Sequence, residues 1–258
     1  MIPVEVRRRI DDALAELERR HDIRILLAVE SGSRAWGFPS PDSDYDVRFI
    51  YVRPTAWYLA LFPGRDVIEE PLAGDLDIVG WDIQKALRLL VKANPAMLEW
   101  LASPIVYRHT PDAEALRQLA AHSPYRRSAR HHYLALARSN YDRYIAERQV
   151  VKLKKYMYCL RPAVALLWMR MHEGRVPMDL PTLLAGIDLP TELLRAIDDL
   201  LALKVASVEM GESPPIPVVD AFIEGEIAEA GGRQAPSPSP DPDLAMLAEA
   251  LFRRLVGG

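Results

Sequence analysis

The chain has 258 residues, which allows one large domain or two of ordinary size. Half of the residues are hydrophobic and 26% are charged, a soluble globular composition in which a core can form. The formal net charge of −4 excludes a globally basic protein, so any polyanion must bind to a local patch.

Cysteine usage and hydropathy bear on the cellular compartment. The chain holds one cysteine, Cys159, so no disulfide can form within it, which fits a reducing compartment. The first twenty residues are amphipathic and charged, without the apolar core of a signal peptide. No run approaches the roughly 18 apolar residues that span a membrane. We therefore expect a cytoplasmic protein that does not enter a membrane.

Helix and strand patterns alternate in the first part of the chain. Apolar residues at helical spacing predict a helix over 3–21. The stretch 31–43 is rich in Gly, Pro, Ser and Asp and predicts a loop. Apolar runs with many β-branched and aromatic residues predict strands over 23–29, 44–52 and 75–81, and a further short strand over 105–108.

From Asp82 onward the predicted elements are almost all helical. Asp82 suits a helix start, because its side chain can cap the free N–H groups of a first turn, and Asn94-Pro95 restarts a helix. Breaks at Ser-Pro, Gly and Pro separate the helical segments. The predicted helices cover 83–92, 96–102, 111–121, 124–149, 151–172, 189–209 and 216–230.

This order of elements predicts an α+β N-terminal half followed by an all-helical half. The stretch GGRQAPSPSPDPD has the low complexity of a linker, and an amphipathic stretch from Leu244 to Val256 follows it. We expect four parts: a core over 1–110, a helical domain over 111–230, a linker over 231–243 and a C-terminal helix over 244–258.

The strongest chemical pattern is Gly32-Ser33, then ten residues, then Asp44-Tyr45-Asp46. On a strand, residues two apart point to one face, so the side chains of Asp44 and Asp46 would share a face, with their Cα atoms roughly 6.5 Å apart. Two carboxylates that close are stabilised by a cation, and Mg²⁺ prefers oxygen ligands together with substrate phosphates. The Gly-Ser turn after a buried strand offers N–H groups and a hydroxyl to a triphosphate.

A third carboxylate is needed to orient an attacking hydroxyl. We choose Asp77, which lies between two apolar residues of the next strand, over Asp75 at the strand mouth. Asp82 is explained more simply as a helix cap. Two other interpretations stay open: an ordinary Asp-rich turn that leads into a strand, or a Ca²⁺-binding loop. Asp-x-Asp alone is a weak signal, whereas the complete set is more specific.

A second pattern is a basic, tyrosine-rich stretch over 124–161. It holds ten Lys or Arg and only two acidic residues. Cations beside aromatic rings suit phosphates and stacked bases. Lys154, Lys155 and Arg161 are the best candidates for phosphate contacts, and Arg34 is a further candidate for a nucleotide contact. For the arginines over 126–148, a solvated helix face is an equally good interpretation.

The segment GSRAWGFPSPDSDYDVRFIY strongly resembles nucleotidyltransferases of the DNA polymerase β superfamily, and within it the YcgL or RNA-repair-associated polymerase-β-like (RlaP) family. The resemblance extends over roughly residues 25–172 through DLDIVGWDIQKALRLLVKANPAMLEWLASPIVY and VKLKKYMYCLRPAVALLWM. It implies a small mixed sheet with flanking helices, three acidic metal ligands, and transfer of a nucleoside monophosphate from an NTP with release of pyrophosphate.

Matching the motifs residue by residue assigns the site. The resemblance places Gly32 and Ser33 at the phosphate-binding turn, Asp44 and Asp46 as paired metal ligands, and Asp77 as the third. It implies Mg²⁺ or Mn²⁺ in a two-metal site. We expect an RNA 3′ end as acceptor. A protein or small-molecule acceptor, and a non-catalytic nucleotide-binding interaction module, are the alternatives.

Overall fold

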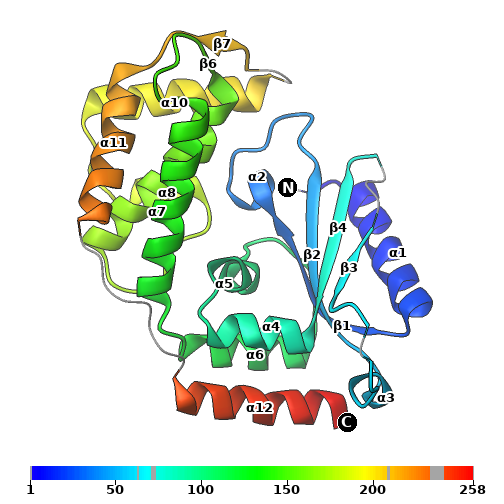
Figure 1. Ribbon diagram of the computed structural model, residues 1–258. Helices are drawn as coiled ribbons and strands as arrows, with labels where there is room; N and C mark the ends of the chain where they lie inside the picture. The colour runs from blue at the N-terminus through cyan, green and yellow to red at the C-terminus, as the bar shows by residue number, and fades with distance from the viewer. Residues whose placement is uncertain (1, 63, 71–73, 208–209, 233–240, 258) are drawn as a thin grey trace. The chain divides into compact units, whose positions relative to one another are not determined.

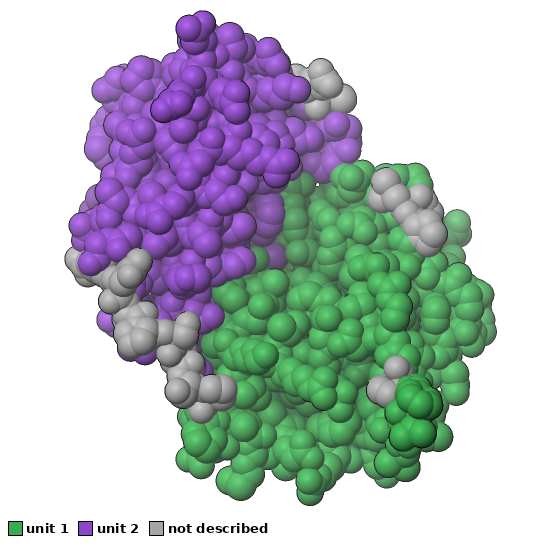
Figure 2. Space-filling model, viewed as in Figure 1, with its two compact units in different colours: residues 1–35, 44–123, 239–258 green, residues 36–43, 124–238 purple. Residues whose placement is uncertain are grey.

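The computed structural model describes residues 2–62, 64–70, 74–207, 210–232 and 241–257. The chain divides into two compact units, which Figure 2 colours separately. The first unit combines residues 1–35, 44–123 and 239–258, and the second combines 36–43 with 124–238. No helix within the described ranges combines the length and the apolar character needed to cross a membrane.

A mixed five-stranded sheet forms the centre of the first unit. Its strand order is β3-β4-β2-β1-β5, with β2 and β4 parallel and the other neighbours antiparallel. The strands are β1 (Arg24–Ser31), β2 (Tyr45–Val52), β3 (Val67–Glu69), β4 (Leu76–Asp82) and β5 (Val106–His109). The α+β class and the small mixed sheet that the sequence predicts are therefore confirmed.

Helix α1 (Val4–His21) covers one face of this sheet (Figure 1). Its apolar stripe, which includes Leu14, packs into a buried cluster with the odd-numbered residues of β2, such as Val47 and Phe49. Because side chains alternate along a strand, the even-numbered residues of β2 face the other side of the sheet. The polar residues of β2 are therefore kept out of the α1 core.

Four longer helices of the first unit lie on the opposite side of the sheet from α1, and α12, the last of them, packs on α4 and α6 (Figure 1). Asp82 caps the first of them by accepting a hydrogen bond from Gln84 N at 2.8 Å, and Asn94 caps the next by accepting from Met97 N at 3.1 Å. The predicted cap at Asp82 is confirmed. These helices are α4 (Ile83–Val91), α5 (Pro95–Ala102), α6 (Pro111–Ala121) and α12 (Pro242–Gly257).

The second unit is a helical bundle with a two-stranded sheet at its edge. Two long helices pack along each other, and α11 packs across both. The elements are α7 (Tyr125–Tyr144), β6 (Val151–Lys152), α8 (Leu153–Met171), α9 (Leu180–Ala185), α10 (Thr191–Ala206), β7 (Glu212–Ser213) and α11 (Pro217–Gly231). Cys159 on α8 is fully buried, as its apolar neighbours predict.

Several boundaries differ from the sequence prediction. The predicted loop over 31–43 contains a short helix, α2 (Gly32–Ala35), and the helix predicted over 124–149 ends at Tyr144. The prediction lacked β6, β7 and α9, and also β3 and α3 (Thr55–Tyr58), because a few residues carry too little periodicity to be recognised.

The division into units also differs from the expected parts. The first helix after residue 110 packs with the sheet unit, and so does the C-terminal helix. Eight residues of the predicted loop, 36–43, are built into the helical unit. Most of the predicted linker, 233–240, lies outside the described residues.

Candidate active site

Two of the predicted carboxylates face each other across the parallel pair of strands. Asp46 on β2 is the register partner of Asp77 on β4. Both point away from α1, because Val47 and Ile78, their neighbours in the chain, are buried in the α1 core. Burial raises the pKa of Asp46; the charge of Arg48 opposes this rise, and the charges of Asp77 and Asp44 add to it. The site therefore concentrates negative charge and oxygen atoms at one place.

Arg48 balances this charge. It lies two residues after Asp46 on the same face of β2, and its Nη2 contacts Asp46 Oδ1 at 3.0 Å and Asp77 Oδ2 at 2.7 Å. Nη1 donates to the carbonyl of Asp77 at 2.9 Å. One guanidinium thus bridges both carboxylates. The i, i+2 spacing was a usable signal in the sequence, but the prediction did not include Arg48.

Gly32 allows Asp46 to approach the backbone closely. It has a φ of +65°, a conformation that favours glycine, and a Cβ built there would overlap the Asp46 carboxylate. Ser31 is paired with Asp46 across β1 and β2, so the Gly-Ser segment begins beside this carboxylate. The structure thus places Gly32 against Asp46, and Ser33 follows Gly32 in the short helix α2.

Glu30 supports the site from inside the sheet and was not predicted. Its side chain has no solvent exposure, accepts a hydrogen bond from Asp46 N at 2.8 Å, and accepts another from the Tyr107 hydroxyl. Burial raises the pKa of Glu30 to about 7, although these two hydrogen bonds oppose the rise. A single Glu at the end of an apolar strand carries no local signal of such a role.

Arg34 lies over the start of β2. Its Nε donates to the carbonyl of Asp44 at 3.1 Å, and its guanidinium carbon is 3.8 Å from the centre of the Tyr45 ring. The Asp44 side chain is exposed. Arg34 therefore fixes the backbone of the first Asp-x-Asp residue, and any contact of Arg34 with a nucleotide remains a prediction.

The choice of Asp77 over Asp75 agrees with the geometry. Asp75 is bound to Arg9 on α1 at 2.5 Å, an exposed ion pair. Asp82 is a buried cap, which also accepts a hydrogen bond from the Tyr58 hydroxyl at 2.8 Å. Neither of these two carboxylates faces Asp46.

The donor set fits a hard divalent cation. Asp46 and Asp77 present carboxylate oxygens of like charge to one another, which Mg²⁺ or Mn²⁺ would neutralise. Within the described part of the chain, no three His, Cys, Asp or Glu side chains already converge as a metal site would require. Asp44 directly precedes β2 and is exposed, and its role as a metal ligand remains a prediction.

The predicted phosphate contacts on α8 have different surroundings from one another. Lys154 is exposed, whereas Lys155 lies 4.1 Å from the centre of the Tyr144 ring. Arg161 is only 4% exposed, and its Nε donates to the carbonyl of Met178 at 2.9 Å. Burial and this hydrogen bond hold the Arg161 guanidinium inside the helical unit, and a contact of Arg161 with a phosphate remains a prediction.

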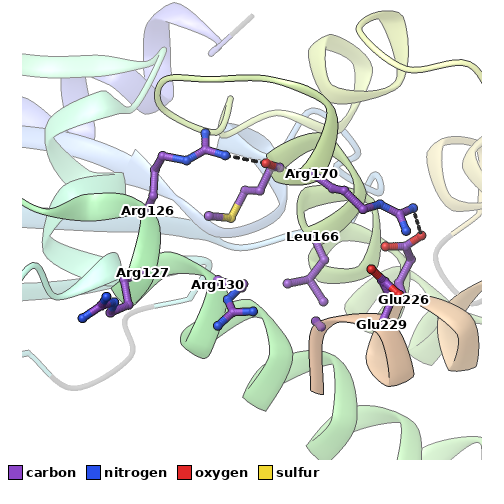
Figure 3. Close-up of a pocket in the computed structure, with 9 residues that line it drawn as sticks. Arg126, Arg127, Arg130, Leu166, Arg170, Glu226 and Glu229 are labelled. Atoms are coloured by element: carbon purple, nitrogen blue, oxygen red, sulfur yellow. Dashed lines mark hydrogen bonds and ion pairs between the residues drawn. The ribbon is translucent and has the colours of Figure 1, made fainter. Parts of the chain in front are cut away.

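The basic stretch also forms a pocket of about 300 Å³ in the helical unit (Figure 3). Arg170 forms an ion pair with Glu226 at 2.7 Å, and Arg126 Nη1 donates to the carbonyl of His172 at 2.7 Å. The charged residues that line the pocket are Arg126, Arg127, Arg130, Arg170, Glu226 and Glu229. Four guanidinium groups against two carboxylates leave the pocket with an excess of positive charge.

Comparisons with known proteins place the chain in a family. The model of the RNA repair pathway DNA polymerase beta family (RlaP) matches residues 6–254. The chain belongs to this family. It is 45% identical over 223 residues to the uncharacterized protein YcgL of Bacillus subtilis (strain 168), covering 86% of this chain and 85% of that protein. A nucleotidyltransferase-like protein from Exiguobacterium sibiricum 255-15 matches 96% of this chain and 90% of its own, at 12% identity and a TM-score of 0.30.

The predicted membership of the RlaP family is thus confirmed over nearly the whole chain. Because this is a polymerase-β-like family, membership supports nucleotidyl transfer as the general chemistry of the protein. For an RlaP protein, the opposed carboxylates at the edge of the β2–β4 pair are the natural candidates for that chemistry.

Proposed function

We propose that this RlaP protein transfers a nucleoside monophosphate from an NTP to the hydroxyl of an RNA 3′ end. The observation that carries the proposal is the direct opposition of Asp46 and Asp77 on parallel neighbouring strands. The family description, which names an RNA repair pathway, and the arginine-lined pocket both favour RNA as the acceptor.

In the proposed reaction, the acceptor oxygen forms a bond to the α-phosphorus, and the bond from that phosphorus to the bridging oxygen breaks. Pyrophosphate leaves, and Asp77 orients the attacking hydroxyl and accepts its proton. Two Mg²⁺ or Mn²⁺ ions held by Asp44, Asp46 and Asp77 would neutralise the charge on the phosphates. The chain contributes positioning and electrostatic stabilisation rather than a covalent intermediate.

The nucleotide would bind where the chain turns from β1 into α2. Gly32 leaves its backbone open beside Asp46, and Ser33 offers a hydroxyl at the next position. Arg34 and the α8 lysines, Lys154 and Lys155, complete the proposed set of nucleotide contacts.

The double variant Asp44→Asn with Asp46→Asn tests the site. It should lose Mg²⁺-dependent transfer of label from α-³²P NTPs to RNA while it keeps its fold by circular dichroism. Asp75→Asn is the matched control, because Asp75 lies two residues before Asp77, as Asp44 lies two residues before Asp46, but pairs with Arg9 on the surface. Transfer that persists in the double variant would refute the site.

The acceptor is tested in the same assay. Wild-type protein is incubated with each labelled NTP and Mg²⁺ or Mn²⁺, together with either RNA or cell lysate, and the labelled product is identified. Label on the RNA 3′ end supports the proposal. Label on a protein or a small molecule instead would replace the acceptor, and absence of label on every acceptor would favour a non-catalytic nucleotide-binding module.

A further inference from the structure

Lys204 on α10 carries a buried charge in the helical unit. Its side chain is 5% exposed, and its Nζ donates to Ser40 Oγ at 2.7 Å. No carboxylate in the described parts of the chain forms an ion pair with this ammonium group. Burying an ammonium with only a hydroxyl as partner is unfavourable. Packing alone therefore gives no reason for a lysine at this position.

The partner of Lys204 belongs to a compact turn of hydroxyl groups. Ser40 is 4% exposed, and its Oγ lies 2.9 Å from Ser43 Oγ. Ser43 Oγ also accepts a hydrogen bond from Ser40 N at 2.9 Å, and Ser43 N donates to the carbonyl of Ser40 at 3.1 Å. The turn thus holds two hydroxyl groups beside the ammonium.

A second ammonium acts on the same place. Burial lowers the pKa of Lys204, the charge of Lys154 lowers it further, and the charge of Asp42 opposes both. The exposed carboxylate of Asp42 forms a hydrogen bond with Ser40 and lies in the field of both lysines. Among the described residues, the charges that act on Lys204 are thus one ammonium group, Lys154, and one carboxylate, Asp42, so the two lysines together exceed the carboxylate in charge.

We propose that Lys204, Lys154 and the turn from Ser40 to Ser43 form a binding site for a phosphate group. A phosphate oxygen supplies the negative charge that the buried ammonium lacks, and charged hydrogen bonds of this kind are the strong ones. Ser43 directly precedes Asp44 in the chain. We therefore take the phosphate to belong to the NTP, and this choice of occupant rests on the proposed function.

The test compares phosphate binding by wild-type protein and Lys204→Met, a substitution that keeps most of the buried volume. Inorganic tripolyphosphate is titrated in EDTA by calorimetry, so that no metal and no transfer is involved. We expect roughly tenfold weaker binding in the variant, from the loss of one charged hydrogen bond. Lys152→Met, an exposed lysine two residues before Lys154, is the matched control and should bind like wild type.

Thermal unfolding separates a binding role from a merely structural one. Without ligand, Lys204→Met should be at least as stable as wild type, because the substitution removes a buried charge. Tripolyphosphate should raise the melting temperature of wild type and of Lys204→Arg, but not that of Lys204→Met.

Two results would overturn the proposal. One is a Lys204→Met variant that is less stable than wild type yet binds tripolyphosphate equally well. The other is a wild-type protein in which Lys204 contributes to the binding of neither tripolyphosphate nor RNA. If Lys204→Met does not fold, Lys154→Met at the exposed lysine replaces it, and unchanged binding there overturns the proposal.

The source of the phosphate is decided by comparing ATP with RNA oligonucleotides that carry or lack a 5′ phosphate. A loss confined to ATP and tripolyphosphate assigns the site to the NTP, and a loss confined to phosphorylated RNA assigns it to the acceptor. The variant Asp44→Asn with Asp46→Asn should still bind tripolyphosphate in EDTA. If the protein binds tripolyphosphate through Lys204 but shows no transferase activity, the phosphate site stands and only the proposed function is refuted.

Discussion

Charge balance at single residues governs the candidate active site. Arg48 is the group that allows Asp46 and Asp77 to face each other while both are partly buried. Glu30 holds the backbone of Asp46 from the interior of the sheet. The carboxylates are thus fixed by neighbours that have no place in the Asp-x-Asp motif.

Replacing Arg48 with Met should lower the free energy of unfolding by about 1–3 kcal/mol, the cost of leaving partly buried partners unsatisfied. Mg²⁺ or Mn²⁺ should restore much of this loss, because a divalent ion supplies the missing positive charge. Denaturant titrations with and without metal measure both effects. Arg9→Met, which breaks the exposed pair with Asp75, is the control and should cost less than about 1 kcal/mol with no rescue by metal.

Glu30 gives the protein a pH-dependent stability. Because the pKa rises from 4.5 to about 7 on folding, the folded state binds more protons than the unfolded state between these pH values. Stability from this group is therefore present at low pH and is lost as the pH rises through about 7. Glu30→Gln should remove that loss, so its stability relative to wild type should rise by up to about 3 kcal/mol between pH 4 and pH 8. Denaturant titrations in EDTA at both pH values measure the stability of Glu30→Gln relative to wild type. If this relative stability falls between pH 4 and pH 8, the raised pKa of Glu30 is contradicted.

Among the elements, the parallel pair β2–β4 carries the opposed carboxylates, and helix α7 carries most of the arginines of the pocket. The register of β2 and β4 places carboxylates on one face and the α1 core on the other. Gly80 on β4 keeps this pair close, because a Cβ there would overlap the Phe49 ring. Helix α7 contributes three of the four arginines that line the pocket of the helical unit.

The variant Arg127→Met with Arg130→Met tests whether α7 binds RNA. If both residues contact phosphates, RNA binding weakens, and the slope of log K against log salt falls by about 1.4, from roughly 0.7 per contact on a single strand. Fluorescence anisotropy with a single-stranded RNA at several salt concentrations measures the slope. Arg253→Met with Arg254→Met on α12 is the control for the loss of two charges. If the slope of the α7 variant is unchanged, these two arginines do not contact RNA phosphates and belong to a solvated helix face.

At the scale of the whole molecule, the helical unit contains part of the segment that connects the Gly-Ser turn with Asp-x-Asp. Residues 36–43 lie between the Gly-Ser turn and Asp-x-Asp, yet they pack with α8 and α9. The carbonyl of Trp36 accepts a hydrogen bond from Leu180 N at 2.9 Å, and the Arg161 guanidinium lies 4.8 Å from the centre of the Trp36 ring. The helical unit therefore cannot be excised as one continuous stretch of chain.

Phe38→Ala tests this dependence. Phe38 is 1% exposed, and a Phe to Ala change in a core costs about 3–5 kcal/mol. Because the loop belongs to the helical unit, faster amide hydrogen exchange should appear in α8 and α9 before it appears in β1 and β2. Exchange measured by mass spectrometry locates the effect. Phe49→Ala, in the core of the sheet unit, should show the opposite distribution.

Local patterns determined most of the longer helices, the main strands and the cap at Asp82, because each depends on residues within one or two turns of the chain. Alternation along the strand that contains Leu76 and Ile78 was enough to prefer Asp77 over Asp75. The family, too, was readable from the motif alone.

Contacts between distant segments decided the rest. The register that opposes Asp46 and Asp77, the burial of Glu30, Arg161 and Lys204, and the placement of residues 36–43 in the helical unit all join residues far apart in the chain. No local periodicity encodes such pairings, since burial and charge balance arise only when separate elements pack together. The sequence by itself determined the family and the residues of the motif, and only the tertiary structure decided which side chains surround them.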